Sequence, residues 1–111
     1  MSRRILIAED DPRSLYALRA VLEQHQFEVI ATADANQAAA TEPSTIEAAL
    51  IDLRLPQMNG ADLARKLRQK NPALRIIFMT AYAPQEIDGE LKDAAVLIKP
   101  LQLEQVLKLL G

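Results

Sequence analysis

Short apolar runs of strand length recur along the chain, and longer stretches with helical spacing separate them. The runs are continuous rather than alternating, which is typical of strands that are covered on both faces of a sheet. Strands that alternate with helices in this way predict a parallel sheet joined by right-handed crossovers. The five runs lie at residues 5–8, 27–31, 48–51, 75–79 and 96–98.

The segment after the first apolar run has the pattern of an amphipathic helix. Asp11 can act as the helix cap, and Pro12 occupies the first helical position, where its missing N–H costs nothing. Apolar residues then follow at intervals of three and four, which predicts one buried face. These residues are Leu15, Leu18, Val21 and Leu22.

Four more helical segments are expected between or after the remaining runs. Asp34 can cap a short alanine-rich helix that Pro43 helps to terminate. Another helix should bury Leu63 and Leu67, and Asn71-Pro72 should close it. The four expected helices cover residues 35–40, 60–70, 84–92 (weak) and 103–110.

The length of 111 residues suits one domain with a single core. Half of the residues are hydrophobic and 25% are charged, as in an ordinary globular chain. One domain with five strand–helix units predicts a small doubly wound α/β sheet that spans residues 1–111.

Composition excludes several classes of function. A net charge of -2 gives no support to direct binding of nucleic acid. Cysteine is absent and His25 is the only histidine, which excludes disulfides and the common zinc sites. No apolar run approaches a membrane span, and residues 5–8 are too short for the core of a signal peptide. We therefore expect a cytoplasmic protein with no membrane contact.

The third apolar run ends directly in a carboxylate, Asp52, within the segment AALIDLRLPQMNG. A lone buried carboxylate costs several kcal/mol, so Asp52 needs either water or partners. In a doubly wound sheet the carboxyl ends of the strands share one edge, and ligands bind there. The other residues expected at that edge are Glu9, Asp10, Asp11, Thr80 and Lys99.

These residue types together suit phosphoryl transfer to a carboxylate. Crowded acids repel one another, and a hard divalent cation such as Mg²⁺ with oxygen ligands relieves that repulsion. The cation would keep Asp52 ionised and nucleophilic, Lys99 would neutralise incoming charge, and Thr80 could donate a hydrogen bond. Asp11 is better explained as a helix cap than as a ligand.

Four segments in this order carry a specific resemblance to a known family. They are ILIAEDD, LIDLRLPQMNG, IIFMTAY and VLIKP, and together they span most of the chain. The chain resembles the receiver domain of two-component response regulators. That resemblance implies a flavodoxin-like (βα)₅ fold with strand order 2-1-3-4-5.

The resemblance also implies a role for each residue at the expected edge. Asp52 matches the phosphoacceptor, which takes its phosphoryl group from the phosphohistidine of a sensor histidine kinase or a phosphotransfer protein. Asp10 would ligate Mg²⁺ directly, Glu9 would act through water, and the backbone carbonyl of Arg54 would be a further ligand. Thr80 matches the switch hydroxyl, and Lys99 matches the phosphate-pairing lysine, whose bond to Pro100 is expected to be cis.

The sequence departs from the family pattern after the fourth apolar run. Val96 stands where a tyrosine or phenylalanine usually reports phosphorylation, and Tyr82 could substitute for it. The segment between Thr80 and Lys99 is about a turn shorter than usual, and Pro84 and Gly89 disfavour helix. We therefore expect a shortened fourth helix, and with it a non-standard surface for binding partner proteins.

Three functions are compatible with these residues. The leading one is a phosphoaccepting switch, with slow self-dephosphorylation as its only turnover. It would change its affinity for a downstream protein target, and a homodimer is compatible with it. The second is an interaction module on the same fold that works without phosphorylation. The third, a phosphatase, is disfavoured because such enzymes use a second carboxylate where this chain has Arg54.

Overall fold

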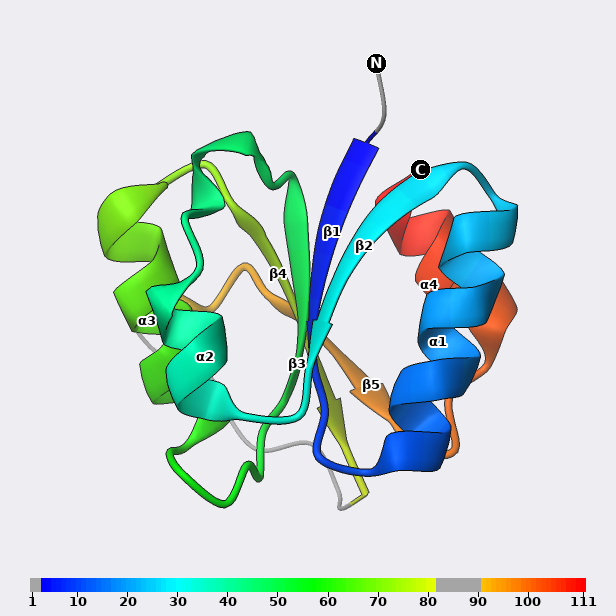
Figure 1. The fold of residues 1–111 in the computed structure, drawn as a ribbon, viewed down its shortest axis with the longest axis horizontal. Helices are drawn as coiled ribbons and strands as arrows, with labels where there is room; N and C mark the ends of the chain where they lie inside the picture. The colour runs from blue at the N-terminus through cyan, green and yellow to red at the C-terminus, as the bar shows by residue number, and fades with distance from the viewer. Residues whose placement is uncertain (1–2, 82–90) are drawn as a thin grey trace.

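The computed structural model describes residues 3–81 and 91–111. It contains a five-stranded sheet with helices on both faces (Figure 1). Along the chain the elements are β1 (Arg3–Ala8), α1 (Pro12–Gln24), β2 (Phe27–Thr32), α2 (Ala35–Ala40), the 3₁₀ helix η1 (Pro43–Thr45), β3 (Ala48–Asp52), α3 (Gly60–Lys70), β4 (Arg75–Thr80), β5 (Ala95–Ile98) and α4 (Leu103–Leu110).

All neighbouring strands pair in parallel, and their order is β2-β1-β3-β4-β5. The sequence therefore predicted both the fold class and the strand order correctly. Asp52 and Thr80 differ slightly from expectation, because they are the last residues of β3 and β4 rather than the first residues beyond them. The 3₁₀ helix at Pro43 was not predicted.

Both faces of the sheet are covered, which explains why its strands are continuously apolar. Helices α1 and α4 lie on one face, and α2 and α3 lie on the other (Figure 1). Within β1, Ile5 and Ile7 pack with the α1/α4 core, while Leu6 and Ala8 pack with the α2/α3 core. Successive strand side chains point to opposite faces, so a strand covered twice needs apolar residues at every position.

Helices α1 and α2 begin where the sequence places their caps. The side chain of Asp11 accepts a hydrogen bond from the backbone N–H of Arg13, and Asp34 accepts two from the first turn of α2. Leu63 and Leu67 of α3 are fully buried, as their spacing predicts. The predicted caps and the predicted buried positions of these helices are therefore both confirmed.

The expected weak helix at 84–92 falls largely on residues 82–90, which lie outside the described residues. Tyr82, Pro84 and Gly89 also lie in that segment, so the shortened fourth helix stays a prediction. Helix α4 (Leu103–Leu110) is therefore the closing helix at 103–110 and not the weak helix expected at 84–92. In residues 3–81 and 91–111, no helix has the length and apolar content that a membrane span needs.

Candidate functional site

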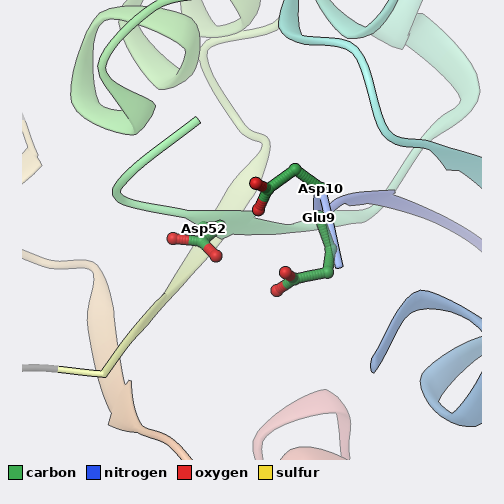
Figure 2. A group of neighbouring side chains, drawn as sticks. All are labelled: Glu9, Asp10 and Asp52. Atoms are coloured by element: carbon green, nitrogen blue, oxygen red, sulfur yellow. The ribbon is translucent and has the colours of Figure 1, made fainter. Parts of the chain in front are cut away.

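Three carboxylates gather where β1 and β3 end (Figure 2). Glu9 and Asp10 directly follow β1, and Asp52 is the last residue of β3, the strand beside β1. One oxygen from each of the three side chains lies within 4.8 Å of the others. Glu9 and Asp52 are buried, whereas Asp10 is exposed to solvent. Solvent therefore reaches this group of carboxylates at Asp10, while Glu9 and Asp52 lie in the interior.

Lys99 brings the opposite charge to the same place from the end of β5. Its Nζ atom lies 2.7 Å from Asp52 Oδ2 and 2.7 Å from Glu9 Oε2. The Lys99-Pro100 peptide bond is cis, as predicted. The backbone N–H of Lys99 donates to the carbonyl of Thr80 at 2.7 Å, which ties the end of β5 to the end of β4.

Thr80 lies one residue beyond Met79, which is opposite Asp52 in the β3–β4 register. The Thr80 residue is only 4% exposed. Parallel pairing thus places the threonine beside the carboxylates and the lysine at one edge of the sheet. The structure brings together five of the six residues that the sequence assigned to this edge, namely Glu9, Asp10, Asp52, Thr80 and Lys99.

Both oxygens of the Asp52 carboxylate have a donor. Oδ1 accepts from the backbone N–H of Arg54 at 2.8 Å, and Oδ2 faces the Lys99 ammonium. Glu9 is fully buried, and its Oε1 accepts from the backbone N–H of Asp11 at 3.0 Å. Asp11 itself points its side chain at the start of α1, so it serves as a cap and not as part of the carboxylate group.

The charges at the site shift the pKa values of two groups. Burial raises the pKa of Glu9 above its usual range, and the nearby Asp52 carboxylate acts in the same direction against the lowering influence of Lys99. Burial alone would lower the pKa of Lys99, but its hydrogen bonds to Asp52 and Glu9 outweigh burial and raise it. The site therefore favours the cationic form of Lys99 and disfavours the ionised form of Glu9.

The balance of charge at this edge suits a divalent cation. Among the described residues, these three carboxylates face the Lys99 ammonium, so ionised side chains leave two negative charges uncompensated there. Carboxylate oxygens are ligands that Mg²⁺ prefers, and Asp10 is open to solvent for a hydrated ion to approach. The donor set of Glu9, Asp10 and Asp52 thus fits Mg²⁺ chemically.

The loop between β3 and α3 presses closely against Asp52. Arg54 and Asn59 form an isolated β-bridge across the loop, and the N–H of Gly60 donates to the carbonyl of Leu53 at 3.0 Å. A Cβ atom at Gly60 would lie 2.3 Å from the carbonyl oxygen of Asp52, closer than real Cβ atoms approach. The sequence alone gives no sign that glycine is required at this contact.

Val96, the main departure from the family pattern, is half-buried in β5 and packs against the α2/α3 core. Its neighbour in the register is Phe78 of β4, which is fully buried. Tyr82, the expected substitute for the missing aromatic residue, lies outside the described residues. Its suggested role therefore stays a prediction.

Comparison with known proteins identifies the family. The model of the response regulator receiver domain matches residues 5–110, and the chain belongs to this family. The regulatory protein VanRB of Enterococcus faecalis is 35% identical over 114 aligned residues, which include 97% of this chain. The chain spans 50% of the length of VanRB.

Two solved structures are similar over nearly the whole chain. A receiver domain protein from Methanospirillum hungatei JF-1 has a TM-score of 0.88 at 31% identity, with 99% of this chain and 91% of that chain covered. A response regulator from Burkholderia pseudomallei, described with a phosphorylated aspartic acid, calcium ion and citrate, has a TM-score of 0.80 at 25% identity. The match covers 99% of this chain and 67% of the Burkholderia chain.

Proposed function

We propose that Asp52 of this receiver domain accepts a phosphoryl group from the phosphohistidine of a sensor histidine kinase or phosphotransfer protein. The observation that carries the proposal is the position of its carboxylate, which lies within 4.8 Å of oxygens of Glu9 and Asp10 and 2.7 Å from Lys99. This combination of nucleophile, cation site and fixed ammonium is what phosphoryl transfer requires. The phosphorylated aspartic acid of the Burkholderia relative agrees with it.

In the proposed reaction an oxygen of Asp52 attacks phosphorus while the bond from phosphorus to the histidine nitrogen breaks. The electron pair of that bond stays on the imidazole, and an acyl phosphate forms on Asp52. Lys99 can turn from the carboxylate to the new phosphoryl oxygens, and Thr80 can donate its hydroxyl hydrogen to one of them. Both groups then stabilise negative charge where it accumulates.

Mg²⁺ would be held by Asp10, Asp52 and the backbone carbonyl of Arg54, with Glu9 acting through water. When bound, the ion supplies positive charge that screens phosphoryl oxygens from the carboxylates. Asp52 can then remain ionised close to two other acids. The chain's own contribution is to fix these oxygens at the ends of two adjacent strands.

Phosphorylation would act as a switch of partner affinity rather than as the first step of catalytic turnover. The position two residues beyond Asp52 holds Arg54, which has no carboxylate to serve as an acid or base for hydrolysis. Slow self-dephosphorylation is the only turnover we expect. The proposal includes a cytoplasmic location and a downstream protein target that discriminates between the two states.

The test is incubation of the wild type and Asp52→Asn with Mg²⁺ and acetyl phosphate, followed by intact-mass measurement. The wild type should gain one phosphoryl group that is lost at alkaline pH, and chelation of the metal should prevent the gain. Asp52→Asn should gain none. A wild type that gains nothing, and that does not respond to beryllofluoride, would favour the alternative of an interaction module that works without phosphorylation.

A further inference from the structure

A hydrogen bond joins the loop that follows Asp52 to the beginning of α2. Oε1 of Gln57 accepts from the backbone N–H of Ala35 at 3.1 Å, across 22 positions of sequence. Gln57 is exposed and lies between β3 and α3, while Ala35 is the first residue of α2 and is fully buried. The side chain therefore connects the loop beside the site to a neighbouring helix.

Further hydrogen bonds hold the first turn of α2, where the donor of this bond lies. Asp34 accepts from the N–H groups of Asn36 and Gln37 at 2.7 and 3.1 Å, and its carbonyl accepts from Ala38. Gln37 is held in turn by the hydroxyl of Thr32 at the end of β2. The first turn of α2 also presents the N–H of Ala35, and Gln57 accepts its hydrogen bond. The glutamine thus adds to the capping that Asp34 provides.

The same loop carries the Arg54 carbonyl that we assign to the metal. At its start the N–H of Leu53 donates to the carbonyl of Met79 at 2.9 Å, and at its end Gly60 bonds to Leu53. Between these anchors the chain passes through the exposed residues Pro56 and Gln57. The bond to Ala35 is thus a polar contact that holds the outer part of the loop to α2.

We infer that Gln57 is a positioning residue, which holds the loop so that the Arg54 carbonyl faces the metal site and which transmits occupancy of that site to α2. The inference rests on the proposed metal ligands. A loop that is already ordered loses less conformational freedom when the ion binds. Because coupling between sites is reciprocal, an ion that orders the loop also strengthens the bond at α2.

The test is a titration with Mg²⁺, followed by beryllofluoride, monitored through backbone amide resonances. Gln57→Ala should weaken Mg²⁺ binding about fivefold, the size of one lost hydrogen bond, and should abolish the response of the Ala35 amide while the Arg54 amide still responds. Gln57→Glu keeps an acceptor oxygen and should retain the Ala35 response. Gln69→Ala, at an exposed position on α3, is the matched control and should behave as the wild type.

A second variant approaches the same bond from its donor. Ala35→Pro removes the N–H, and proline is accepted at the first position of a helix. It should weaken Mg²⁺ binding as much as Gln57→Ala, and the double variant should be no weaker than either.

Wild-type affinity together with a wild-type Ala35 response in Gln57→Ala would overturn the inference. Full additivity in the double variant would overturn it as well. Failure of the wild type itself to bind Mg²⁺ would instead overturn the proposed function, so the two failures are distinguishable.

Discussion

Both ends of the sheet carry ion pairs, but the pairs differ in how far their side chains are exposed to solvent. At the carboxyl end, Lys99 meets Asp52 at 2.7 Å, and their side chains are 22% and 8% exposed. At the amino end, Arg3 meets Glu47 at 2.6 Å, with side chains 43% and 31% exposed. The distances are nearly equal, so the environment and not the geometry separates the two pairs.

At the amino end, the guanidinium groups of Arg3 and Arg75 both donate hydrogen bonds to backbone carbonyls of α4. The guanidinium of Arg3 also donates to the carbonyl of Leu110 and lies 4.9 Å from the centre of the Phe27 ring, and Arg75 donates to the carbonyl of Leu109. These arginines therefore stabilise the last turn of α4, where positive charge is favourable. At the carboxyl end the acids outnumber the cation, which is the condition for recruiting a metal.

Ion pairs occur at both ends of the sheet, so their presence does not identify the functional site. What distinguishes the carboxyl end is its excess of carboxylates over ammonium groups. A paired surface charge contributes little to stability, whereas a buried excess of one sign is costly, and a functional site can retain it despite that cost. Equivalent substitutions at the two ends should therefore differ in their effects on stability.

Gly60→Ala should destabilise the fold by about 3 kcal/mol, at the upper end of overpacking costs, because backbone atoms of Asp52 and Leu53 surround the new methyl group. Gly111→Ala at the end of α4 is the counterpart. Its Cβ meets nothing within 4 Å, so only its positive φ of 64° opposes the change, and about 1 kcal/mol is expected. Urea unfolding measures both, and equal losses would show that the contact at Gly60 is unimportant.

Lys99→Met should lower the free energy of unfolding by about 2 kcal/mol at neutral pH without metal, because it leaves two buried carboxylates without their cation. Arg3→Met should cost about 1 kcal/mol or less, since its carboxylate partner is partly solvated. Added Mg²⁺ should restore stability to Lys99→Met and not to Arg3→Met. Restoration of both, or of neither, would contradict the assignment of surplus negative charge to one end.

Glu9→Gln should raise stability by about 1 kcal/mol at pH 7 without metal, by sparing the cost of a buried charge. Because the pKa of Glu9 is raised above 4.5, its stabilising contribution is present below that pH and is lost as the pH rises through the folded-state value.

Glu47→Gln should act in the opposite direction. The hydrogen bond from Arg3 lowers the pKa of Glu47, so its contribution is present above 4.5 and is lost as the pH falls through the folded-state value. Unfolding curves from pH 3 to pH 8 test both signs, and a loss of stability in Glu9→Gln at pH 7 would contradict the account.

Much of the fold could be predicted from local pattern. The ranges 35–40, 60–70 and 103–110 coincide with α2, α3 and α4, because the signals that predict them lie within the helices or directly beside them. The convergence of Glu9, Asp52 and Lys99 was also predictable, since it follows from the topology of a parallel sheet.

Contacts that depend on the close approach of separate segments could not be predicted. The sequence shows that Gly60 is a glycine, but not that the backbone of Asp52 lies against it. It likewise gives no indication that Gln57 reaches Ala35, because that bond depends on how the loop folds over α2. Nor does it show that one ammonium is shared by Glu9 and Asp52.

The most direct test of the central claim is chemical mapping of the phosphorylated residue. After reaction with acetyl phosphate, borohydride reduces an aspartyl phosphate to homoserine, which peptide mass spectrometry can locate. The account predicts homoserine at position 52 alone, and only when Mg²⁺ is present during phosphorylation. Homoserine at position 10 or 11, or formation at position 52 without any divalent cation, would contradict it.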